Sequence, residues 1–171
     1  MVEHFYIPAD EELMHISEFT ALARRLGAIS AYAYLGDVGE SPTGDKKAQK
    51  FEDGYLPELF ATLKAEGFSA VTYMPSRNTR AQLAEIMRRC DENGLFQISG
   101  EDINSPRQSF ICPALADPNY SHLKVSTYAL IGHETAASND IEDSMFSDRT
   151  CERYPDLGER VRHYAQLGGL N

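Results

Sequence analysis

The sequence predicts an α/β fold in which parallel strands alternate with helices. Three short apolar segments, residues 28–35, 69–75 and 95–99, show little alternation of polar and apolar side chains, as expected of strands covered on both faces. Segments with helical spacing of apolar residues separate them, and a glycine follows each helix. This order is typical of right-handed β-α-β units and of a parallel sheet.

Capping residues and glycines place the helices around these strands. Asp10 can cap a first helix that ends at Gly27. Its inward side is expected to consist of Leu13, Ile16, Ala23 and Leu26. A second helix precedes Gly67, and Thr79 with Gln82 forms a capping box for the third. We expect a further helix over residues 122–138, with its inward face formed by Leu123, Ser126 or Thr127, Leu130 and Ile131.

The length of 171 residues suits a single α/β domain, 1–171, in which residues 139–171 form a peripheral tail and helix. The stretch 138–155 is expected to be a mobile connection. Three strands make a short sheet with open edges. We therefore expect further strands, a second copy of the chain or the rest of a larger barrel to cover those edges.

Composition and charge exclude several classes of partner. The formal net charge is −10, and so acidic a chain repels nucleic acid and anionic lipid. Cys90, Cys112 and Cys151 have neither disulfide-framework nor zinc-site spacing, and Cys90 falls on the apolar face of its helix. The sequence lacks a signal peptide and the ~18 apolar residues needed to cross a membrane. We expect a cytoplasmic protein without nucleic-acid or membrane partners.

Polar side chains gather where the three strands end. In parallel α/β folds, ligands bind at this carboxyl edge. A rim of carboxylates, amides and guanidinium groups suits a hydrated divalent cation or a small polar or phosphorylated molecule. Its members are Tyr32, Tyr34, Asp37, Tyr73, Ser76, Arg77, Asn78, Glu101, Asp102, Asn104 and Arg107. The carboxylates of Asp37, Glu101 and Asp102 are the candidate metal ligands.

A structural interpretation of the last loop stays open beside this one. Asp102, Asn104 and Ser105 precede Pro106 and suit turn and capping roles, with Arg107 as their salt-bridge partner.

Other catalytic motifs are incomplete. Residues 39–46, GESPTGDK, resemble a phosphate-binding P-loop but carry Asp45 where that loop needs lysine. His133-Glu134 lacks the second histidine of HExxH, so His133 is interpreted as a structural or surface residue.

The segments AISAYAYLGD, AVTYMPSRNT and LFQISGEDINSPRQ resemble successive strand-end loops of the polymerase and histidinol phosphatase (PHP) superfamily. In GEDIN, Asp102 falls on the family's metal-ligand aspartate, while Asn104 replaces a histidine. Tyr34 likewise stands at a histidine position. The resemblance implies a partial or modified β/α barrel of the PHP type, with a cluster of divalent metal ions and phosphoester hydrolysis.

The resemblance also assigns roles to individual residues. Asp102 would contribute to a metal site holding Mn, Zn or Mg, and Arg77 or Arg107 would hold the phosphate. Asp102 and Arg107 are thus the catalytic candidates, and substrate binding falls to Tyr34, Arg77, Asn78, Asn104 and Arg107. The chain lacks the family's His-x-His. It therefore resembles the C-terminal part of a PHP-like phosphoesterase, inactive alone, with a missing N-terminal segment or a homodimer partner completing it.

Two other hypotheses remain. In one, a PHP-like module without metal uses the strand-end tyrosines, Tyr34 among them, together with Asn78, Asn104 and Arg107 to hold a small polar or phosphorylated molecule. In the other, the strand-end groups form only a hydrogen-bonded network, and the chain serves as an assembly partner.

Overall fold

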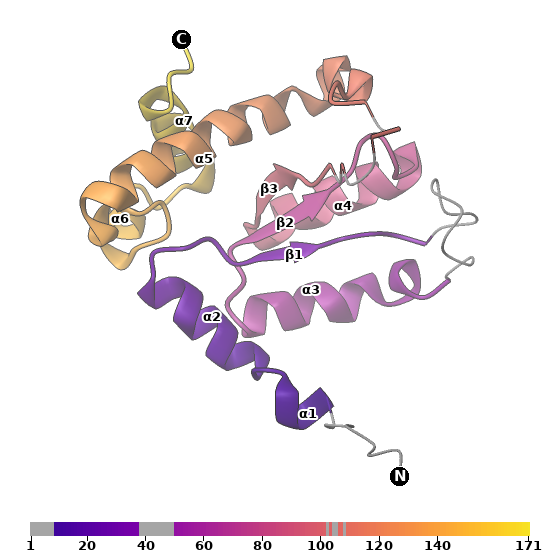
Figure 1. Cartoon of the computed structure of the whole chain (residues 1–171), viewed down its shortest axis with the longest axis horizontal. Coiled ribbons are helices and arrows are strands. Elements are labelled where there is room, and N and C mark those ends of the chain that lie inside the picture. The colour runs from indigo at the N-terminus through magenta and orange to yellow at the C-terminus, as the bar shows by residue number, and fades with distance from the viewer. Residues whose placement is uncertain (1–8, 38–49, 102, 104–105, 108) are drawn as a thin grey trace.

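The computed structural model describes residues 9–37, 50–101, 103, 106–107 and 109–171. Its centre is a three-stranded parallel sheet in the order β1-β2-β3 (Figure 1). The strands are β1 (Ala31–Ala33), β2 (Ala70–Tyr73) and β3 (Phe96–Ser99). Ala31 pairs with Ala70, which pairs with Phe96 on its other side. The predicted parallel sheet is confirmed, but within the described residues it is open and not closed into a barrel.

Helices separate the strands as predicted. The 3-10 turn η1 (Glu52–Tyr55) leads into α3 (Leu56–Ala65), which precedes β2, and α4 (Arg80–Asn93) joins β2 to β3. The capping box of α4 is confirmed, because Thr79 Oγ1 accepts the Gln82 N–H at 3.2 Å and Gln82 Oε1 accepts the Thr79 N–H at 2.8 Å. Gly94 ends the helix with φ at +64°.

One face of the sheet packs on α3 and α4. Val71 and Tyr73 of β2 share a hydrophobic cluster with Leu63 of α3 and Ile86 of α4. Cys90 lies in the same cluster, on the apolar face of α4 as predicted, and burial raises the pKa of its thiol to about 12. The thiol therefore acts as a small apolar side chain of the core.

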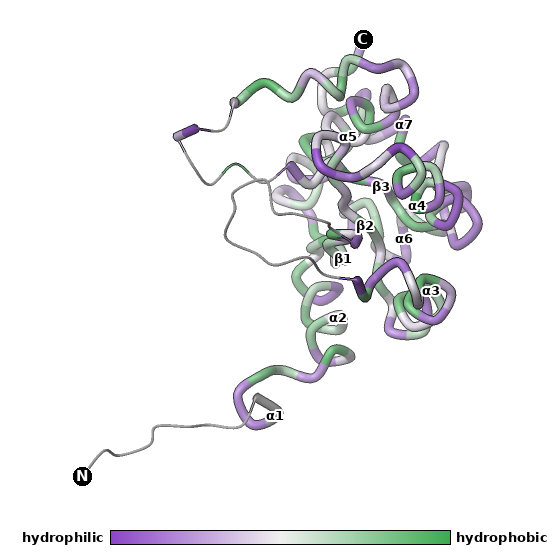
Figure 2. The backbone as a smooth tube through the Cα atoms, turned by 90° about the vertical axis from the view of Figure 1, so that its right-hand side faces the viewer, coloured by the Kyte–Doolittle hydropathy of each residue, from purple (hydrophilic) through white to green (hydrophobic). Residues whose placement is uncertain are grey.

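The N-terminal helix differs from the prediction, because two helices replace one: α1 (Ala9–Glu12) and α2 (Ile16–Arg25). His15 breaks the helix, since it is extended (φ −62°, ψ 143°) and its side chain caps α2 by accepting the Ser17 N–H. The expected inward face is mostly exposed, with Leu13 70% accessible and only Ala23 buried. Both helices project away from the sheet (Figures 1 and 2), and hydrophobic residues lie along α2 in Figure 2. Coverage of these residues by a second copy stays a prediction.

The second half of the chain contributes most of a second hydrophobic cluster, which packs against the sheet. After the 3-10 turns η2 (Pro113–Ala116) and η3 (Pro118–Tyr120), helix α5 (Ser121–Asn139) packs against β3. The prediction for its inward face is correct at Leu123 and Ser126 but wrong at Ile131, which is exposed. Gly132 and His133 are buried instead, because another helix packs on that side.

That helix is α7 (Leu157–Leu167), which α6 (Asp148–Arg153) and the 3-10 turn η4 (Ile141–Asp143) precede. A hydrophobic cluster joins Ala70 and Phe96 of the sheet to α5, α7 and the connection before α6, through Ala129, Met145, Tyr164 and Ala165. The predicted structural role of His133 is confirmed, because its Nδ1 accepts the Met145 N–H at 3.0 Å. Burial lowers the pKa of this imidazole.

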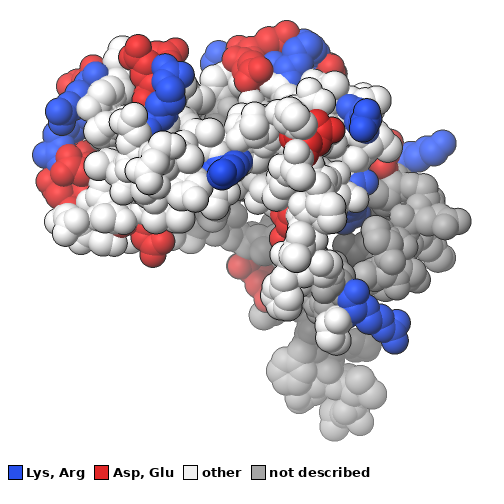
Figure 3. All heavy atoms as spheres, turned by 90° about the horizontal axis from the view of Figure 1, so that it is seen from above, with Lys and Arg blue, Asp and Glu red and all other residues white. Residues whose placement is uncertain are grey.

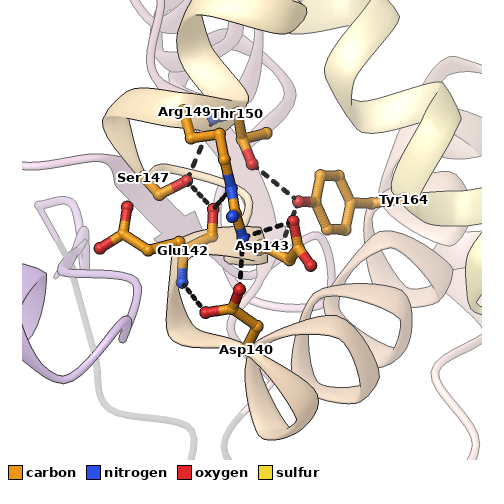
Figure 4. A network of polar contacts seen from close by, with 7 residues as sticks. All are labelled: Asp140, Glu142, Asp143, Ser147, Arg149, Thr150 and Tyr164. Atoms are coloured by element: carbon orange, nitrogen blue, oxygen red, sulfur yellow. Dashed lines mark hydrogen bonds and ion pairs between the residues drawn. The ribbon is translucent and has the colours of Figure 1, made fainter.

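Polar contacts hold the connection that we expected to be mobile, residues 138–155 (Figure 4). The Arg149 guanidinium forms ion pairs with Asp140 at 2.7 Å and Asp143 at 2.8 Å, and its Nε donates to the Glu142 carbonyl. The Tyr164 hydroxyl of α7 donates to the Asp143 carbonyl. These contacts join η4, α6 and α7 into one packed unit, so that residues 139–171 supply part of the core.

The described helices contain no segment long and apolar enough to span a membrane. In the view from above in Figure 3, acidic and basic side chains are interspersed around an uncharged area and do not form a continuous basic surface on that face.

Helices α5 and α7 approach each other closely where Gly132 faces Tyr164 and Gly168 faces Tyr128. A Cβ at Gly132 would lie 1.9 Å from the Tyr164 carbonyl oxygen, and one at Gly168 would lie 1.9 Å from that of Tyr128. Backbone cannot yield as a flexible side chain does, so both positions require glycine.

We expect Gly132→Ala to destabilise the protein by about 2 kcal/mol, because overpacking forces the two helices apart. Gly54→Ala is the matched control, since a Cβ at Gly54 meets nothing within 4 Å, and it should change the free energy of unfolding by less than about 0.5 kcal/mol. Urea denaturation of both variants measures the difference. Equal stability of the two variants would show that α5 and α7 do not approach this closely.

Candidate functional site

The carboxyl ends of the three strands meet through two side chains. Asn78, only 7% exposed, donates from Nδ2 to the Leu35 carbonyl at 2.8 Å and accepts the Met74 N–H at 2.9 Å. It thereby ties the segment after β1 to the segment after β2. Glu101 follows β3 and accepts from the backbone N–H of Ser76 at 3.2 Å and from the Ser76 hydroxyl. The predicted gathering of polar residues at this edge is therefore present.

Two carboxylates that the sequence patterns did not indicate, those of Glu52 and Asp53, anchor the segment after β1. Glu52 is 9% exposed, and it accepts from the Tyr32 hydroxyl at 2.7 Å and from the backbone N–H groups of Leu35 at 3.1 Å and Gly36 at 2.7 Å. Asp53 accepts from the Tyr34 hydroxyl at 2.5 Å. Their position ahead of a helix suggests only capping, and their partners become neighbours only in the folded chain.

Tyr34, a predicted substrate-binding residue, is 1% exposed and belongs to the core. Burial, reinforced by the hydrogen bond to Asp53, raises the pKa of its phenol well above the usual value. The hydroxyl therefore stays protonated and donates to Asp53. The structure places Tyr34 beneath the edge as a support and does not present it on an open surface.

Gly36 lies at the centre of this network and has φ at +72°. A Cβ there would lie 2.8 Å from Gln82 Nε2 and 2.9 Å from both Asn78 Nδ2 and the Tyr34 hydroxyl. Glycine is required both by the backbone conformation and by the space. Gln82, singled out above only as a capping residue, also donates from Nε2 to the Asp37 carbonyl at 2.9 Å and to Asp53 Oδ2 at 2.8 Å.

Asp37, a predicted metal ligand, acts as a cap. Its Oδ1 accepts the backbone N–H groups of Phe51 at 2.8 Å, Glu52 at 2.8 Å and Asp53 at 3.2 Å. The N–H of Phe51, followed by those of Asp53 and Glu52, lowers the pKa of the Asp37 carboxyl. The carboxylate thus orders the start of η1.

The described residues do not by themselves form the metal cluster that the PHP resemblance implies. Within the described part of the chain, no three His, Cys, Asp or Glu side chains come together as a metal site. The carboxylates of Asp37 and Glu101 are engaged with backbone and hydroxyl donors, from different strand ends. Asp102, the ligand on which the resemblance rests, lies outside the described residues, as do Asn104 and Ser105.

Arg77, a predicted substrate-binding residue, has a buried polar atom without a hydrogen-bond partner among the described residues. The side chain is half-buried, and its Nε is buried without a hydrogen-bond partner in the described structure. Ser99 Oγ, at the last residue of β3, is also buried without a partner. Buried polar atoms nearly always have partners, so these two atoms are exceptions among the described residues. Arg107, predicted for the same role, is exposed.

We expect Asp37→Ala to lower the free energy of unfolding at neutral pH by about 1 kcal/mol, the usual effect of removing a cap. Asp37→Asn retains Oδ1 and should cost less. Because the folded-state pKa is lowered, the contribution of the charge is present above the unfolded pKa of about 3.9 and is lost as the pH falls through the folded pKa. The free energies of unfolding of wild type and Asp37→Asn, measured by urea denaturation, should therefore converge as the pH falls into the acid range.

The exposed Glu152 on α6 provides the control. Glu152→Gln should not reproduce the pH dependence of the Asp37→Asn difference. A difference between wild type and Asp37→Asn that persists unchanged in acid would contradict the lowered pKa.

Comparison of the chain with protein-family models, curated proteins and solved structures gave no match. The functional argument therefore depends on the geometry of the carboxyl edge itself.

Proposed function

We propose that this chain is a PHP-like binding module that holds a small polar or phosphorylated molecule at the carboxyl edge of its sheet. The observation that carries the proposal is the buried Nε of Arg77, which has no acceptor among the described residues. It lies on the loop after β2, where parallel α/β folds bind ligands.

The chemistry of Arg77 selects the ligand class. A guanidinium group donates two parallel hydrogen bonds from a rigid plane, which matches a phosphate or carboxylate group. Leaving such a donor buried without an acceptor costs about 1–3 kcal/mol, and a bound oxyanion removes that cost. Ser99 Oγ offers a second polar contact for a hydroxyl group or a phosphate oxygen. In this proposal Asn104 and Arg107 contribute from the loop after β3.

The network below Arg77 supports a rigid site. Asn78, Glu52 and Gln82 hold the segments around the carboxyl edge through partly buried hydrogen bonds. A site built on such supported backbone loses little conformational entropy when a ligand binds.

Phosphoester hydrolysis by a larger PHP-like assembly is the second proposal. In this second proposal, the open three-stranded sheet is the C-terminal segment of a β/α barrel, and Asp102 is a ligand of a divalent metal ion. We favour the metal-free module for this chain, because Asp37 and Glu101 already accept internal hydrogen bonds and Tyr34 donates to Asp53. A phenol and a carboxamide are also poorer metal ligands than the imidazoles they replace.

We expect a sugar phosphate such as glucose 6-phosphate to raise the melting temperature more than glucose or inorganic phosphate at equal concentration. Arg77→Gln should weaken the sugar phosphate affinity at least ~10-fold, since a hydrogen bond to a charged group is lost. Arg80→Gln is the matched control, because the Arg80 side chain is 90% exposed and Arg80 begins α4, directly after the loop that carries Arg77. Equal affinities of the two variants would refute the role of Arg77.

The purified chain supplied with Mn, Zn or Mg is expected not to hydrolyse p-nitrophenyl phosphate, because the carboxylates of Asp37 and Glu101 already accept internal hydrogen bonds. Steady-state assays with each metal test this expectation. Metal-dependent turnover that Asp102→Ala abolishes would overturn the metal-free module and favour the phosphoesterase.

A further inference from the structure

A second guanidinium group, that of Arg160 on α7, is buried at a distance from the carboxyl edge. Arg160 is 7% exposed. Its Nη1 lies 2.7 Å from Cys151 Sγ and donates weakly to the Met145 carbonyl at 3.4 Å. The guanidinium also lies over the Phe146 ring, 5.2 Å from its centroid. Its Nε is buried without a hydrogen-bond partner in the described structure.

These contacts leave the positive charge of Arg160 without an anion. None of the ion pairs in the described part of the chain includes Arg160. Buried charges are nearly always paired, because removing an ion from water costs several kcal/mol. A thiol and a long contact to one carbonyl are weak acceptors, and a ring face compensates only part of that cost. A buried guanidinium in this state indicates a missing counter-charge.

A cavity of about 260 Å³ adjoins this guanidinium. It lies at the amino ends of the strands, since its walls include residues just before each strand: Ser30 before β1, Ser69 before β2 and Gly94 before β3. Cys151, the neighbour of Arg160 Nη1, also lines it. The guanidinium end of Arg160 therefore reaches this cavity. The cavity lies at the amino ends of the strands, whereas Arg77 lies at their carboxyl ends.

The cavity wall is positively charged although the chain as a whole is acidic. Arg24 of α2 and Arg160 both line it, against a single carboxylate, that of Asp148. Arg24 is exposed, so it can reach the cavity from the solvent side, whereas Arg160 is held inside.

Hydroxyl groups complete the wall. Ser30 and Ser144 are both buried, and both line the cavity. Ser30 Oγ accepts the Ser69 N–H at 3.2 Å, which leaves its own proton for another acceptor. The size suits a ligand of few atoms, and the donors are those that oxygen anions accept.

We propose that this cavity binds a compact oxyanion, a phosphate or carboxylate group, which neutralises Arg160 from inside while Arg24 closes on it from the solvent side. The packed α6–α7 unit holds Cys151 and Arg160 beside the cavity. Binding there ties α2 to the sheet and to the C-terminal helices, so the anion stabilises the fold.

The test compares two neighbouring arginines at the end of α2. Arg24 lines the cavity, whereas Arg25 is equally exposed and does not. At constant ionic strength, inorganic phosphate should raise the melting temperature of wild type and Arg25→Gln alike, and Arg24→Gln should bind it several-fold more weakly. Acetate in place of phosphate distinguishes a carboxylate site from a phosphate site. No stabilisation of wild type by either anion, or equal affinity in the two variants, overturns the proposal.

Arg160→Met and Arg160→Lys test the buried charge. Arg160→Met should abolish the anion response without lowering the stability of the anion-free protein, because it removes an unpaired buried charge. Arg160→Lys should retain part of the response. A response that survives in folded Arg160→Met refutes the site, and Arg24→Gln decides the matter if Arg160→Met does not fold.

The rate of alkylation of Cys151 measures whether the cavity is occupied. A bound oxyanion shields its sulfur, so phosphate should slow the alkylation of Cys151 by iodoacetamide, while Cys112, which does not line the cavity, serves as the internal reference. The protection should persist in Arg77→Gln, which separates this cavity from the carboxyl-edge site. Unchanged alkylation of Cys151 at saturating phosphate contradicts the proposal.

Discussion

The buried carboxylate of Glu52 is the contact on which the carboxyl edge of the sheet depends. A short parallel strand leaves backbone donors beyond its last ladder bond, and these donors need acceptors when they are buried. Glu52 supplies acceptors to Leu35 and Gly36 and to the Tyr32 hydroxyl at the same time. The segment after β1 is thereby bound to η1, which precedes α3, and Asn78 extends the same support to the loop after β2.

This arrangement gives the acidic residues at the strand ends a structural role as hydrogen-bond acceptors. Carboxylates near the ends of parallel strands suggested metal ligands, yet Glu52, Asp53, Asp37 and Glu101 all accept hydrogen bonds from the chain itself. Among the described residues, the buried side-chain atoms without a hydrogen-bond partner are Arg77 Nε, Ser99 Oγ and Arg160 Nε. Two of these three atoms belong to guanidinium groups, on which the two proposals of anion binding rest.

The C-terminal helices pack together and onto the sheet as one unit. The close approach of α5 and α7 at Gly132 places the inner face of α7, which carries both Tyr164 and Arg160, against the rest of the core. Tyr164 joins α7 to η4 through the Asp143 carbonyl, and Arg160 joins it to α6 at Cys151. Residues 139–171, which the sequence suggested to be a peripheral tail and helix, thus supply Met145, Tyr164 and Ala165 to the second hydrophobic cluster.

The sequence by itself determined the local elements. Apolar runs, glycine stops and the Thr79–Gln82 capping box depend on neighbours a few residues apart, and they correctly predicted the three strands, their parallel direction and helices α3, α4 and α5. It also identified Arg77 and Asn78 as residues of the carboxyl edge, because the ends of parallel strands lie together by geometry.

Only the tertiary structure decided which polar groups are satisfied within the chain. Tyr34 and Asp53 are 19 residues apart, and Asn78 and Leu35 are 43 apart, so no local pattern reveals their pairing. The same holds for the break at His15 and for the exposed Ile131, since local periodicity contains no information about which neighbour a helix finally packs on. Long-range contact decides these points because the cost of burying a polar or apolar group depends on what lies opposite it in space.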